Sequence, residues 1–250
     1  MGRYDGRVAI VTGASSGIGR ATALRLAAEG ASVACLDVAT GANETTAADA
    51  NDSGGGKAIA LTCDVSDEDA VASAVDTAVS TFGSPHLLCN VAGIGCFRHT
   101  HEMTLADWNR IIAVNLTGTF LTSRACIPML LDTRGSIVNV ASVAGLKAQP
   151  YSAAYSASKA GVALFTRSVA MEYAETTLRV NAIAPGSIDT AITEQFAFPD
   201  GASSTLLGRI MPYQAFGRPE DCAALIAFLG SDEARYVSGA VIPVDAASSA

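Results

Sequence analysis

Short runs of apolar and β-branched residues alternate along this chain with longer, alanine-rich segments in which apolar positions recur at helical spacing. The short runs predict strands at residues 7–12, 31–37, 58–63, 86–89, 135–141, 178–184 and 240–244. The longer segments predict helices at residues 17–29, 41–51, 67–81, 105–131, 152–174 and 219–229. The spacing of Ser66 and Asp69 predicts a capping box at the start of the third helix. Thr104 and Asp107 predict another at the start of the fourth.

The regular alternation of strands and helices predicts an α/β fold. Strands that are joined through helices run parallel, and right-handed crossovers place those helices on both faces of the sheet. We therefore expect residues 1–250 to form a single domain built on a doubly wound parallel sheet of the Rossmann type. Residues 191–213 show no clear periodicity. An irregular segment of that length in a compact domain predicts a binding loop, placed at about residues 190–216.

Composition and charge exclude several classes of function. The formal net charge is −8, and only 16% of the residues are charged, so the chain has no basic stripe for a nucleic acid. The first apolar run ends at Thr12 and Gly13, which makes it too short for a signal peptide. No run approaches the roughly 18 apolar residues that a membrane span needs. A hydrophobic content of 50% instead predicts a globular protein with a large core.

The six cysteines form no CxxC pair, and Cys35, Cys63 and Cys89 lie in predicted strands. We interpret them as reduced core residues of a cytoplasmic protein. His99 and His101 lack a third ligand nearby in the sequence, so we expect no metal site.

The turn after the first predicted strand is rich in glycine, from Thr12 to Gly19, and leads into a helix. Glycines at such a turn let a diphosphate approach the backbone N–H groups at the positive end of the helix dipole. A nucleotide triphosphatase loop needs Lys after the last glycine, but Arg20 stands there. The turn also matches the G-x-S-x-G elbow of hydrolases, but no histidine follows His101 to complete a triad. A turn used only for packing stays as an alternative.

Asp37 ends the second predicted strand, 18 residues after Gly19. A carboxylate at about this spacing binds the adenosine ribose hydroxyls and repels a 2′-phosphate, which favours NAD over NADP. A lone Asp at a strand end can also be a simple turn residue. Asp64 and Val65 close the third strand at the same edge of the sheet.

Tyr155 and Lys159 are four residues apart on a predicted helix, so their side chains share one face. A nearby ammonium favours the phenolate of a tyrosine, which can then exchange a proton with a substrate hydroxyl or carbonyl. Ser142, at the end of the strand at residues 135–141, offers a hydroxyl that can orient the same oxygen. Taken alone, Ser142 is as readily a turn cap, and Asn115 a solvated or buried helix amide.

Together these residues resemble the short-chain dehydrogenase/reductase family over nearly the whole chain. The resemblance rests on the T-G-x-x-x-G-x-G turn from Thr12 to Gly19, Asp64-Val65, Asn90-Val91-Ala92-Gly93, Asn115, Ser142, Tyr155-x3-Lys159, and Pro185-Gly186 with Ile188 and Thr190.

The resemblance implies a catalytic set. Tyr155 is expected to be the acid/base, and Ser142 to position the substrate. Lys159 is expected to lower the pKa of Tyr155 and to hold the nicotinamide ribose. Asn115 is expected to anchor a water in a proton relay. The resemblance also implies cofactor contacts at Gly13, Ser15, Ser16, Gly17, Ile18, Gly19, Asp37, Asp64, Val65, Asn90, Ala92, Gly93, Tyr155, Lys159, Pro185, Gly186, Ile188 and Thr190, and a homotetramer assembled through the two long helices and the last strand.

The chain departs from the family pattern at Val91, where a second Asn is common, at His86, where Asp is common, and at Ala246-Ala247, where Gly-Gly is common. None of these positions belongs to the expected catalytic set.

The sequence predicts an NAD-dependent oxidoreductase that interconverts a secondary alcohol and a ketone. An NADPH-dependent 3-oxoacyl-thioester reductase and a non-catalytic dinucleotide-sensing protein remain as alternatives. Asp37 and the lack of a basic residue at Ser15 and Ser16 argue against the first. The presence of both Tyr155 and Lys159 argues against the second. The binding loop predicts a bulky, apolar substrate through Ile192, Phe196, Phe198, Leu206, Leu207, Ile210, Met211, Tyr213 and Phe216, which face Val143-Ala144-Gly145-Leu146, Ile94 and Phe97.

Overall fold

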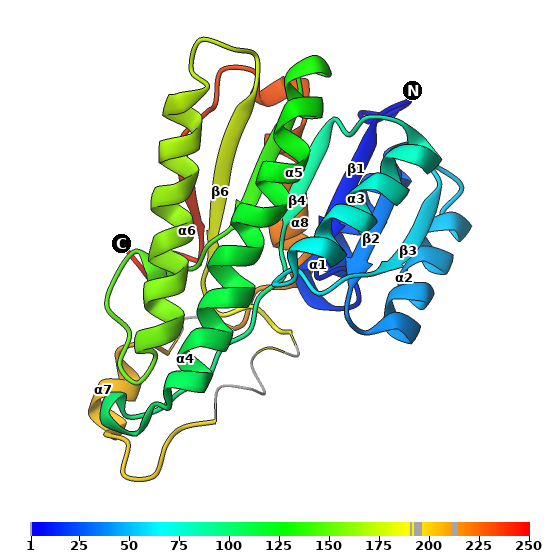
Figure 1. The fold of residues 1–250 in the computed structure, drawn as a ribbon. Coiled ribbons are helices and arrows are strands. Elements are labelled where there is room, and N and C mark those ends of the chain that lie inside the picture. Colours follow the sequence, from blue (N-terminus) through cyan, green and yellow to red (C-terminus); the bar gives the residue numbers. More distant parts are fainter. Residues whose placement is uncertain (1, 191, 193–196, 212–214) are drawn as a thin grey trace.

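A computed structural model describes residues 2–190, 192, 197–211 and 215–250. In this part of the chain one sheet has the strand order β3-β2-β1-β4-β5-β6-β7, and all neighbouring pairs are parallel (Figure 1). The strands are β1 (Val8–Thr12), β2 (Ser32–Asp37), β3 (Ala58–Thr62), β4 (Leu87–Asn90), β5 (Ser136–Val140), β6 (Arg179–Pro185) and β7 (Val241–Val244). The predicted doubly wound sheet is confirmed.

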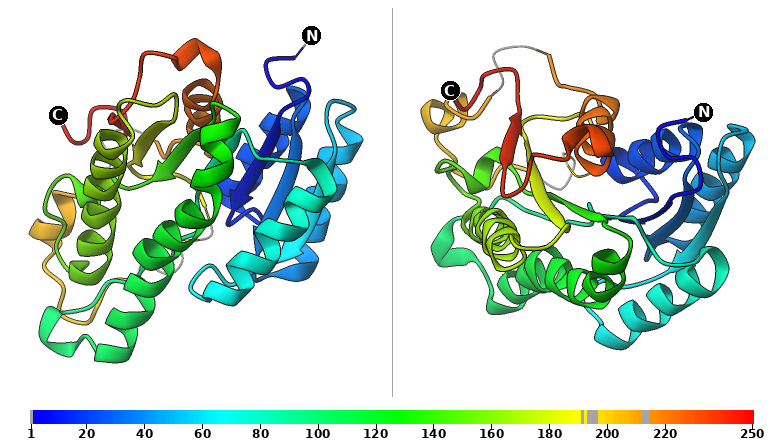
Figure 2. Two further views of the ribbon diagram at one scale, coloured as in Figure 1. Left: turned by 45° about the horizontal axis from the view of Figure 1, so that its top comes forward. Right: turned by 90° about the horizontal axis from the view of Figure 1, so that it is seen from above.

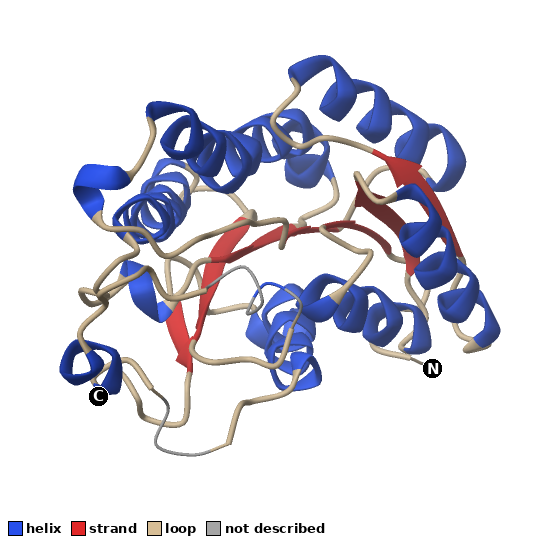
Figure 3. Ribbon diagram, turned by 90° about the horizontal axis from the view of Figure 1, so that it is seen from below, coloured by secondary structure: helices blue, strands red, loops and turns tan. Residues whose placement is uncertain are grey.

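Helices cover both faces of the sheet (Figures 2 and 3). One layer holds α1 (Gly17–Ala28), α2 (Thr40–Asp52) and α8 (Pro219–Gly230), and the other holds α3 (Glu68–Phe82), α5 (Gly118–Asp132) and α6 (Ala153–Glu172). The shorter α4 (Leu105–Ile112) and α7 (Ser204–Gly208) lie beyond the carboxyl edge of the sheet, and 3₁₀ turns occur at Thr100–Glu102, Val143–Gly145 and Asp232–Ala234.

The core consists of one apolar cluster on each face of the sheet, because successive strand residues point to opposite sides. Ile10 packs in the cluster with α3 and α5, whereas its neighbours Ala9 and Val11 pack in the cluster with α1 and α8. All five residues of β1 are buried, as expected for a parallel strand covered on both faces. This explains why the strands appear in the sequence as continuous apolar runs.

One departure from the family pattern lies at the start of the paired strands β1 and β4. His86 Nδ1 accepts a hydrogen bond from Val8 N at 3.2 Å, so the imidazole helps to join the two strands. Burial lowers the pKa of His86, which favours the neutral ring that this acceptor role requires.

The single helix predicted at residues 105–131 is wrong. The structure has α4, then a π-helix over Ala113–Thr117, then α5. The side chain of Asn115, in the middle of the π segment, exchanges two hydrogen bonds with the backbone of Ile94, at 2.8 and 2.9 Å. This contact joins residues that are 21 positions apart in the sequence and accounts for the widened helical turn. Such π-bulges commonly occur at functional sites.

The capping predictions had mixed outcomes. Thr104 caps α4 as expected, with its hydroxyl accepting from Asp107 N at 3.0 Å. At α3 the predicted cap is wrong, because Asp67 accepts from the first-turn amides in place of Ser66. The Ser66 hydroxyl instead donates to Asp64 Oδ1 at 2.7 Å.

No helix in the described ranges is both long and apolar enough to cross a membrane. All six cysteines are free thiols, and five are buried in the core as expected. The core interpretation is wrong for Cys96, which is partly exposed.

Candidate active site

A cavity of about 850 Å³ opens at the carboxyl ends of the strands. Its described lining comes from the segments that follow β1, β2, β3, β4, β5 and β6, together with residues of α4, the π segment and the C-terminal tail. The strand order reverses between β1 and β4, which is where an open parallel sheet binds its ligand. The predicted site therefore lies in one continuous cavity.

The glycine turn brings the backbone of β1 against the loop after β4. Gly13 has φ +66°, and a Cβ on it would lie 2.8 Å from Ala92 Cα. Gly17 has φ +49°, and a Cβ there would lie 2.9 Å from Thr190 Cγ2. A side chain at either position would collide with the neighbouring segment that lines the cavity. The helix α1 starts at Gly17, and the Ser16 side chain caps none of its amides, so the N-terminus can bind an anion.

Thr12 is a positioning residue that the sequence analysis did not include among the site residues. Its hydroxyl accepts from Val91 N and Ala92 N, at 3.0 and 3.1 Å, and so fixes the loop after β4. Asn90 lies behind the cavity wall, not in it: its amide donates to Ser123 and Asn139. Ala92 and Gly93 do line the cavity.

Asp37 lies at the end of the cavity that follows β2. One carboxylate oxygen accepts from Ser15 N at 3.0 Å and the other from Ala39 N at 2.9 Å, which fixes the carboxylate against the glycine turn. Each oxygen keeps a lone pair for a further donor such as a ribose hydroxyl. Asp64 and Val65 line the cavity beside it, after β3.

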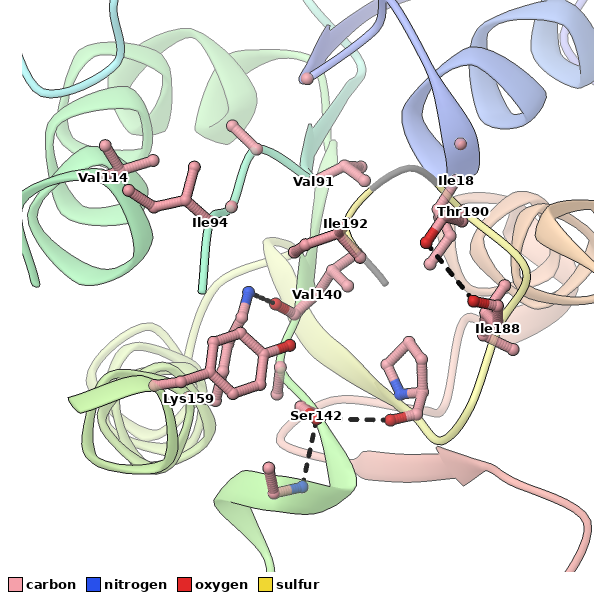
Figure 4. A pocket seen from close by; sticks show the side chains of 18 of the residues that line it. Ile18, Val91, Ile94, Val114, Val140, Ser142, Lys159, Ile188, Thr190 and Ile192 are labelled. Carbon is pink, nitrogen blue, oxygen red and sulfur yellow. Dashed lines mark hydrogen bonds between the residues drawn. The ribbon is translucent and has the colours of Figure 1, made fainter. Parts of the chain in front are cut away.

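Lys159, Tyr155 and Ser142 form the wall of the cavity that follows β5. Figure 4 labels Lys159 and Ser142 in this wall. Lys159 is 3% exposed, and its ammonium donates to Val140 O at 2.8 Å and lies 5.9 Å from the centre of the Tyr155 ring. The Ser142 hydroxyl accepts from Ala144 N at 3.1 Å and lies 3.4 Å from Pro185 O. The structure thus brings together the three residues predicted to act on the substrate.

Burial and hydrogen bonding set the electrostatics of this wall. Burial raises the pKa of Tyr155, and the hydrogen bond with the Ser142 hydroxyl lowers it. The Lys159 ammonium is committed to Val140 O, and burial lowers its own pKa to about 8. The ammonium of Lys159 therefore carries a desolvation cost that a further hydrogen-bond acceptor would reduce.

Asn115 lies behind this wall and is completely buried. Besides its bonds to Ile94, its side-chain amide donates to Ser158 Oγ at 2.9 Å, and its backbone carbonyl accepts from Thr119 Oγ1 at 2.8 Å. Its side chain holds the loop after β4 against α6, so its visible role is to position Gly93 and Ile94.

Pro185, Gly186, Ile188 and Thr190 line the cavity after β6, as expected. Ile188 also forms a bridge with Gly217, which closes the base of the predicted binding loop. Ala191, Glu194, Phe196 and Tyr213 of that loop lie outside the described residues.

The remaining loop residues give the substrate end an apolar lining. Ile192, Phe198, Ile210, Met211 and Phe216 contribute to the wall, whereas Leu206 and Leu207 are not part of it. Opposite them lie Ile94, Phe97, Val143 and Ala144. The expected contributions of Gly145 and Leu146 are wrong, because Gly145 packs on the Lys159 backbone and Leu146 is 40% exposed away from the lining.

Three contacts fasten the described part of the loop to the domain. The rings of Phe97 and Phe198 stack with their centres 5.4 Å apart. His99 Nε2 lies 3.0 Å from Asp200 O, and the Tyr151 hydroxyl accepts from Ser203 N at 2.9 Å. Neither His99 nor Tyr151 was predicted to matter, and no local pattern in the sequence marks them. His99 and His101 lie close together, but the described residues contain no group of three side chains suited to a metal.

The chain was compared with known proteins. Residues 13–247 match the family described as enoyl-(acyl carrier protein) reductase. The chain is 44% identical to the cis-4-hydroxycyclohexanecarboxylate dehydrogenase of Sinomonas cyclohexanicum, over 96% of this chain and 95% of that protein. It is 41% identical to the 3-oxoacyl-(acyl-carrier-protein) reductase FabG of Thermotoga maritima, over 97% of this chain and 98% of that protein.

Two solved structures are similar over almost their whole length. Levodione reductase superimposes with a TM-score of 0.91 at 35% identity, covering 98% of both chains. A short-chain dehydrogenase from Mycobacterium paratuberculosis bound to NAD superimposes with a TM-score of 0.90 at 30% identity, covering 99% of both chains.

An uncapped helix end, a carboxylate held by the glycine turn and a wall of Tyr, Lys and Ser lie around one cavity. Together with the similar proteins, they define an oxidoreductase that uses a nicotinamide dinucleotide and acts on alcohol or carbonyl groups. The chain belongs to the short-chain dehydrogenase/reductase family. The expected family, fold and class of enzyme are confirmed.

Proposed function

We propose that the protein is an NAD-dependent dehydrogenase that interconverts a bulky, apolar secondary alcohol and its ketone. The observation that carries this proposal is the distribution of groups around one cavity. Asp37 lies at the end that follows β2, whereas Ser142, Tyr155 and Lys159 lie at the end that follows β5. A dinucleotide that extends across the switch point has its adenosine at the first end and its nicotinamide at the second.

The residues present fit this cofactor. The α1 N-terminus can take the diphosphate, Asp37 the adenosine ribose, and Lys159 the nicotinamide ribose, with Pro185, Gly186, Ile188 and Thr190 along the nicotinamide. When bound, the nicotinamide accepts or supplies the hydride.

The chain itself handles the proton. In the oxidation direction Tyr155 takes the proton of the substrate hydroxyl, and in reduction it returns a proton to the carbonyl oxygen. Ser142 hydrogen bonds to the same oxygen and orients it. Lys159 places positive charge behind the phenol, and Asn115 holds the loop that carries Gly93 and supports the water relay.

A carboxylate at Asp37 supports NAD over NADP, because a 2′-phosphate would meet a like charge that two backbone amides hold in place. The relative from Thermotoga maritima is a reductase of acyl thioesters, so an NADPH-dependent 3-oxoacyl-thioester reductase is the second candidate. Positions 15 and 16 of the lining hold serine, so neither offers a basic side chain that could bind a 2′-phosphate.

The apolar lining around Phe97 and Phe198 supports a cyclic or polycyclic alcohol over a sugar. The relative from Sinomonas cyclohexanicum is named for a cyclic alcohol. A cytoplasmic location, where NAD is available and thiols stay reduced, agrees with six free cysteines.

We further propose a homotetramer. Leu105 on α4, Phe120 on α5, and Leu164 and Met171 on α6 are exposed, and a subunit contact would bury them. Light scattering after gel filtration is expected to give about 102 kDa, four times 25.4 kDa. A mass near 25.4 kDa would contradict the assembly.

The experiment that tests the function follows NADH formation at 340 nm with a panel of cyclic alcohols, hydroxysteroids, sugars and polyols. Turnover of the cyclic alcohols with NAD, far above that of sugars, is the expected result. Reduction of 3-oxoacyl thioesters with NADPH at higher efficiency than any alcohol oxidation would favour the second candidate. Cofactor binding without turnover of any compound would favour a sensing protein.

A further inference from the structure

The charged residues that line the cavity are divided between its two ends. In the described lining, both carboxylates, Asp37 and Asp64, follow β2 and β3. The segments that follow β5 and β6 contribute three charged side chains, Lys147, Lys159 and Arg209, and all three are cations, as is Arg110 of α4. The described lining of the end that receives the substrate is thus positive, in a protein whose net charge is −8.

Lys147 can be placed at the substrate end through a series of contacts. Its ammonium donates to the backbone carbonyl of Ser248, in the C-terminal tail. Ser248 Oγ lies 3.4 Å from where a Cβ on Gly186 would be. The residue before Gly186 is Pro185, whose carbonyl lies 3.4 Å from Ser142 Oγ. These contacts connect Lys147 to Ser142 through the tail and the segment after β6, and both side chains line the same cavity.

No described residue neutralises the charge of Lys147. Its recorded partner is a neutral carbonyl, and among the described residues it takes part in no ion pair. An ammonium has three donors, so two remain for a ligand. Arg209 likewise forms no ion pair in the described ranges. Gln149, two residues after Lys147, also lines the cavity.

From this geometry we infer that the substrate carries a carboxylate at the end of its apolar body remote from the reacting alcohol, and that Lys147 binds this carboxylate. The inference rests on the proposed alcohol oxidation and adds the chemical class of the substrate, a hydroxy acid with an apolar ring between its two polar groups. The apolar wall around Phe97 and Phe198 receives the ring, Ser142 and Tyr155 the hydroxyl, and Lys147 the anion. Two free donors match the two oxygens of a carboxylate.

Three ring alcohols of nearly the same shape test the inference: 4-hydroxycyclohexanecarboxylate, its methyl ester and cyclohexanol. With the wild type and NAD, the carboxylate is expected to have a kcat/KM about five- to tenfold above that of the ester, mainly through KM. Because Lys147 is exposed, this advantage should shrink as salt is added.

Lys147→Met keeps the length of the side chain and removes its charge. The ratio of kcat/KM for the carboxylate to that for the ester is expected to fall five- to tenfold, and Lys147→Arg is expected to retain most of it. Lys57→Met, which removes an exposed ammonium that does not line the cavity, is the matched control and should leave the ratio as in the wild type.

A ratio unchanged in Lys147→Met, with both substrates weakened alike, would overturn the inference and leave Lys147 as a tether for the tail. A wild type that prefers the ester would also overturn it. If the wild type oxidises none of the three alcohols, the proposed function fails and binding decides the inference. Cyclohexanecarboxylate should then still raise the Tm of the wild type with NAD present, but not that of Lys147→Met, and no shift in either would overturn the inference as well.

Discussion

Lys159 Nζ donates a 2.8 Å hydrogen bond to Val140 O, the last carbonyl of β5. Ser142 follows two residues later, so one strand end fixes both the ammonium and the hydroxyl of the reacting wall. The absence of a side chain at Gly93 leaves room for this ammonium, because a Cβ there would lie 3.2 Å from Lys159 Nζ. The sheet and α6 therefore position the side chains that act on the substrate before any ligand enters.

Tyr155→Phe keeps the ring and removes the exchangeable proton. Turnover is expected to fall by about 10²-fold or more, whereas the affinity for NAD should change little, because the proton is needed for chemistry and not for binding. Steady-state kinetics and NADH fluorescence titration measure the two effects. Lys159→Ala is the contrasting variant and should weaken both turnover and NAD binding. A Tyr155→Phe enzyme that retains most of its activity would remove Tyr155 from the mechanism.

The pH profile of alcohol oxidation tests the hydrogen bond between Ser142 and Tyr155. Tyr155 must lose its proton to act as the base, so kcat/KM should rise with pH through an acid limb. The Ser142 hydroxyl lowers the pKa of Tyr155, while burial raises it. In Ser142→Ala the lowering contribution is lost, so the limb should move to higher pH as the rate falls. Ser142→Thr keeps a hydroxyl and should keep the limb in place. A limb that stays in place or moves to lower pH in Ser142→Ala would show that this hydrogen bond does not tune the base.

Cofactor choice depends on Asp37. The wild type is expected to use NAD far more efficiently than NADP, and Asp37→Ser should narrow the gap mainly by weakening NAD. The kcat/KM values for both cofactors at one saturating alcohol concentration measure this. Asp49→Ser, which removes an acid that does not line the cavity, is the control. Equal efficiencies in the wild type would refute the role of the carboxylate and strengthen the reductase alternative.

The fastening of the substrate loop gives a prediction about KM. Tyr151→Phe keeps the ring against His99 but removes the acceptor of Ser203 N. A lost hydrogen bond of about 1 kcal/mol should raise KM for bulky alcohols severalfold, with a smaller effect on kcat. Amide hydrogen exchange over residues 197–211 should become faster. Tyr236→Phe changes a fully exposed tyrosine and should alter neither. An unchanged KM and unchanged exchange would show that the other two contacts suffice.

Much of the fold and of the catalytic wall could be predicted because the signals are local. The alternation of elements is visible in the hydrophobic pattern, and the spacing of Tyr155 and Lys159 places both on one helix face whatever surrounds them. Asp37 and the glycine turn likewise follow from strand ends that the pattern marks.

The rest depends on contacts between distant parts of the chain. The π segment arises from the pairing of Asn115 with the Ile94 backbone, and no local spacing predicts it. The pKa of Tyr155 depends on burial and on the hydrogen bond with Ser142, and the sequence reveals neither. Ser248 reaches the cavity only because the tail folds back across Gly186.

The tail also contains the departure at Ala246 and Ala247, and its geometry leads to a prediction of stability. Both alanines are exposed and have left-handed backbones, with φ +49° and +66°. An L-residue with a Cβ pays about 1–2 kcal/mol for this conformation, whereas glycine avoids that cost but loses some entropy. Ala246→Gly and Ala247→Gly should each therefore raise the free energy of unfolding by about 0.5–1 kcal/mol.

Urea unfolding at one protein concentration measures the change through a higher midpoint at an unchanged slope. Ala48→Gly, at an exposed position within α2, is the matched control and should lower stability by up to about 1 kcal/mol. If the tail variants are destabilised like the control, then the backbone at residues 246 and 247 is not left-handed in solution.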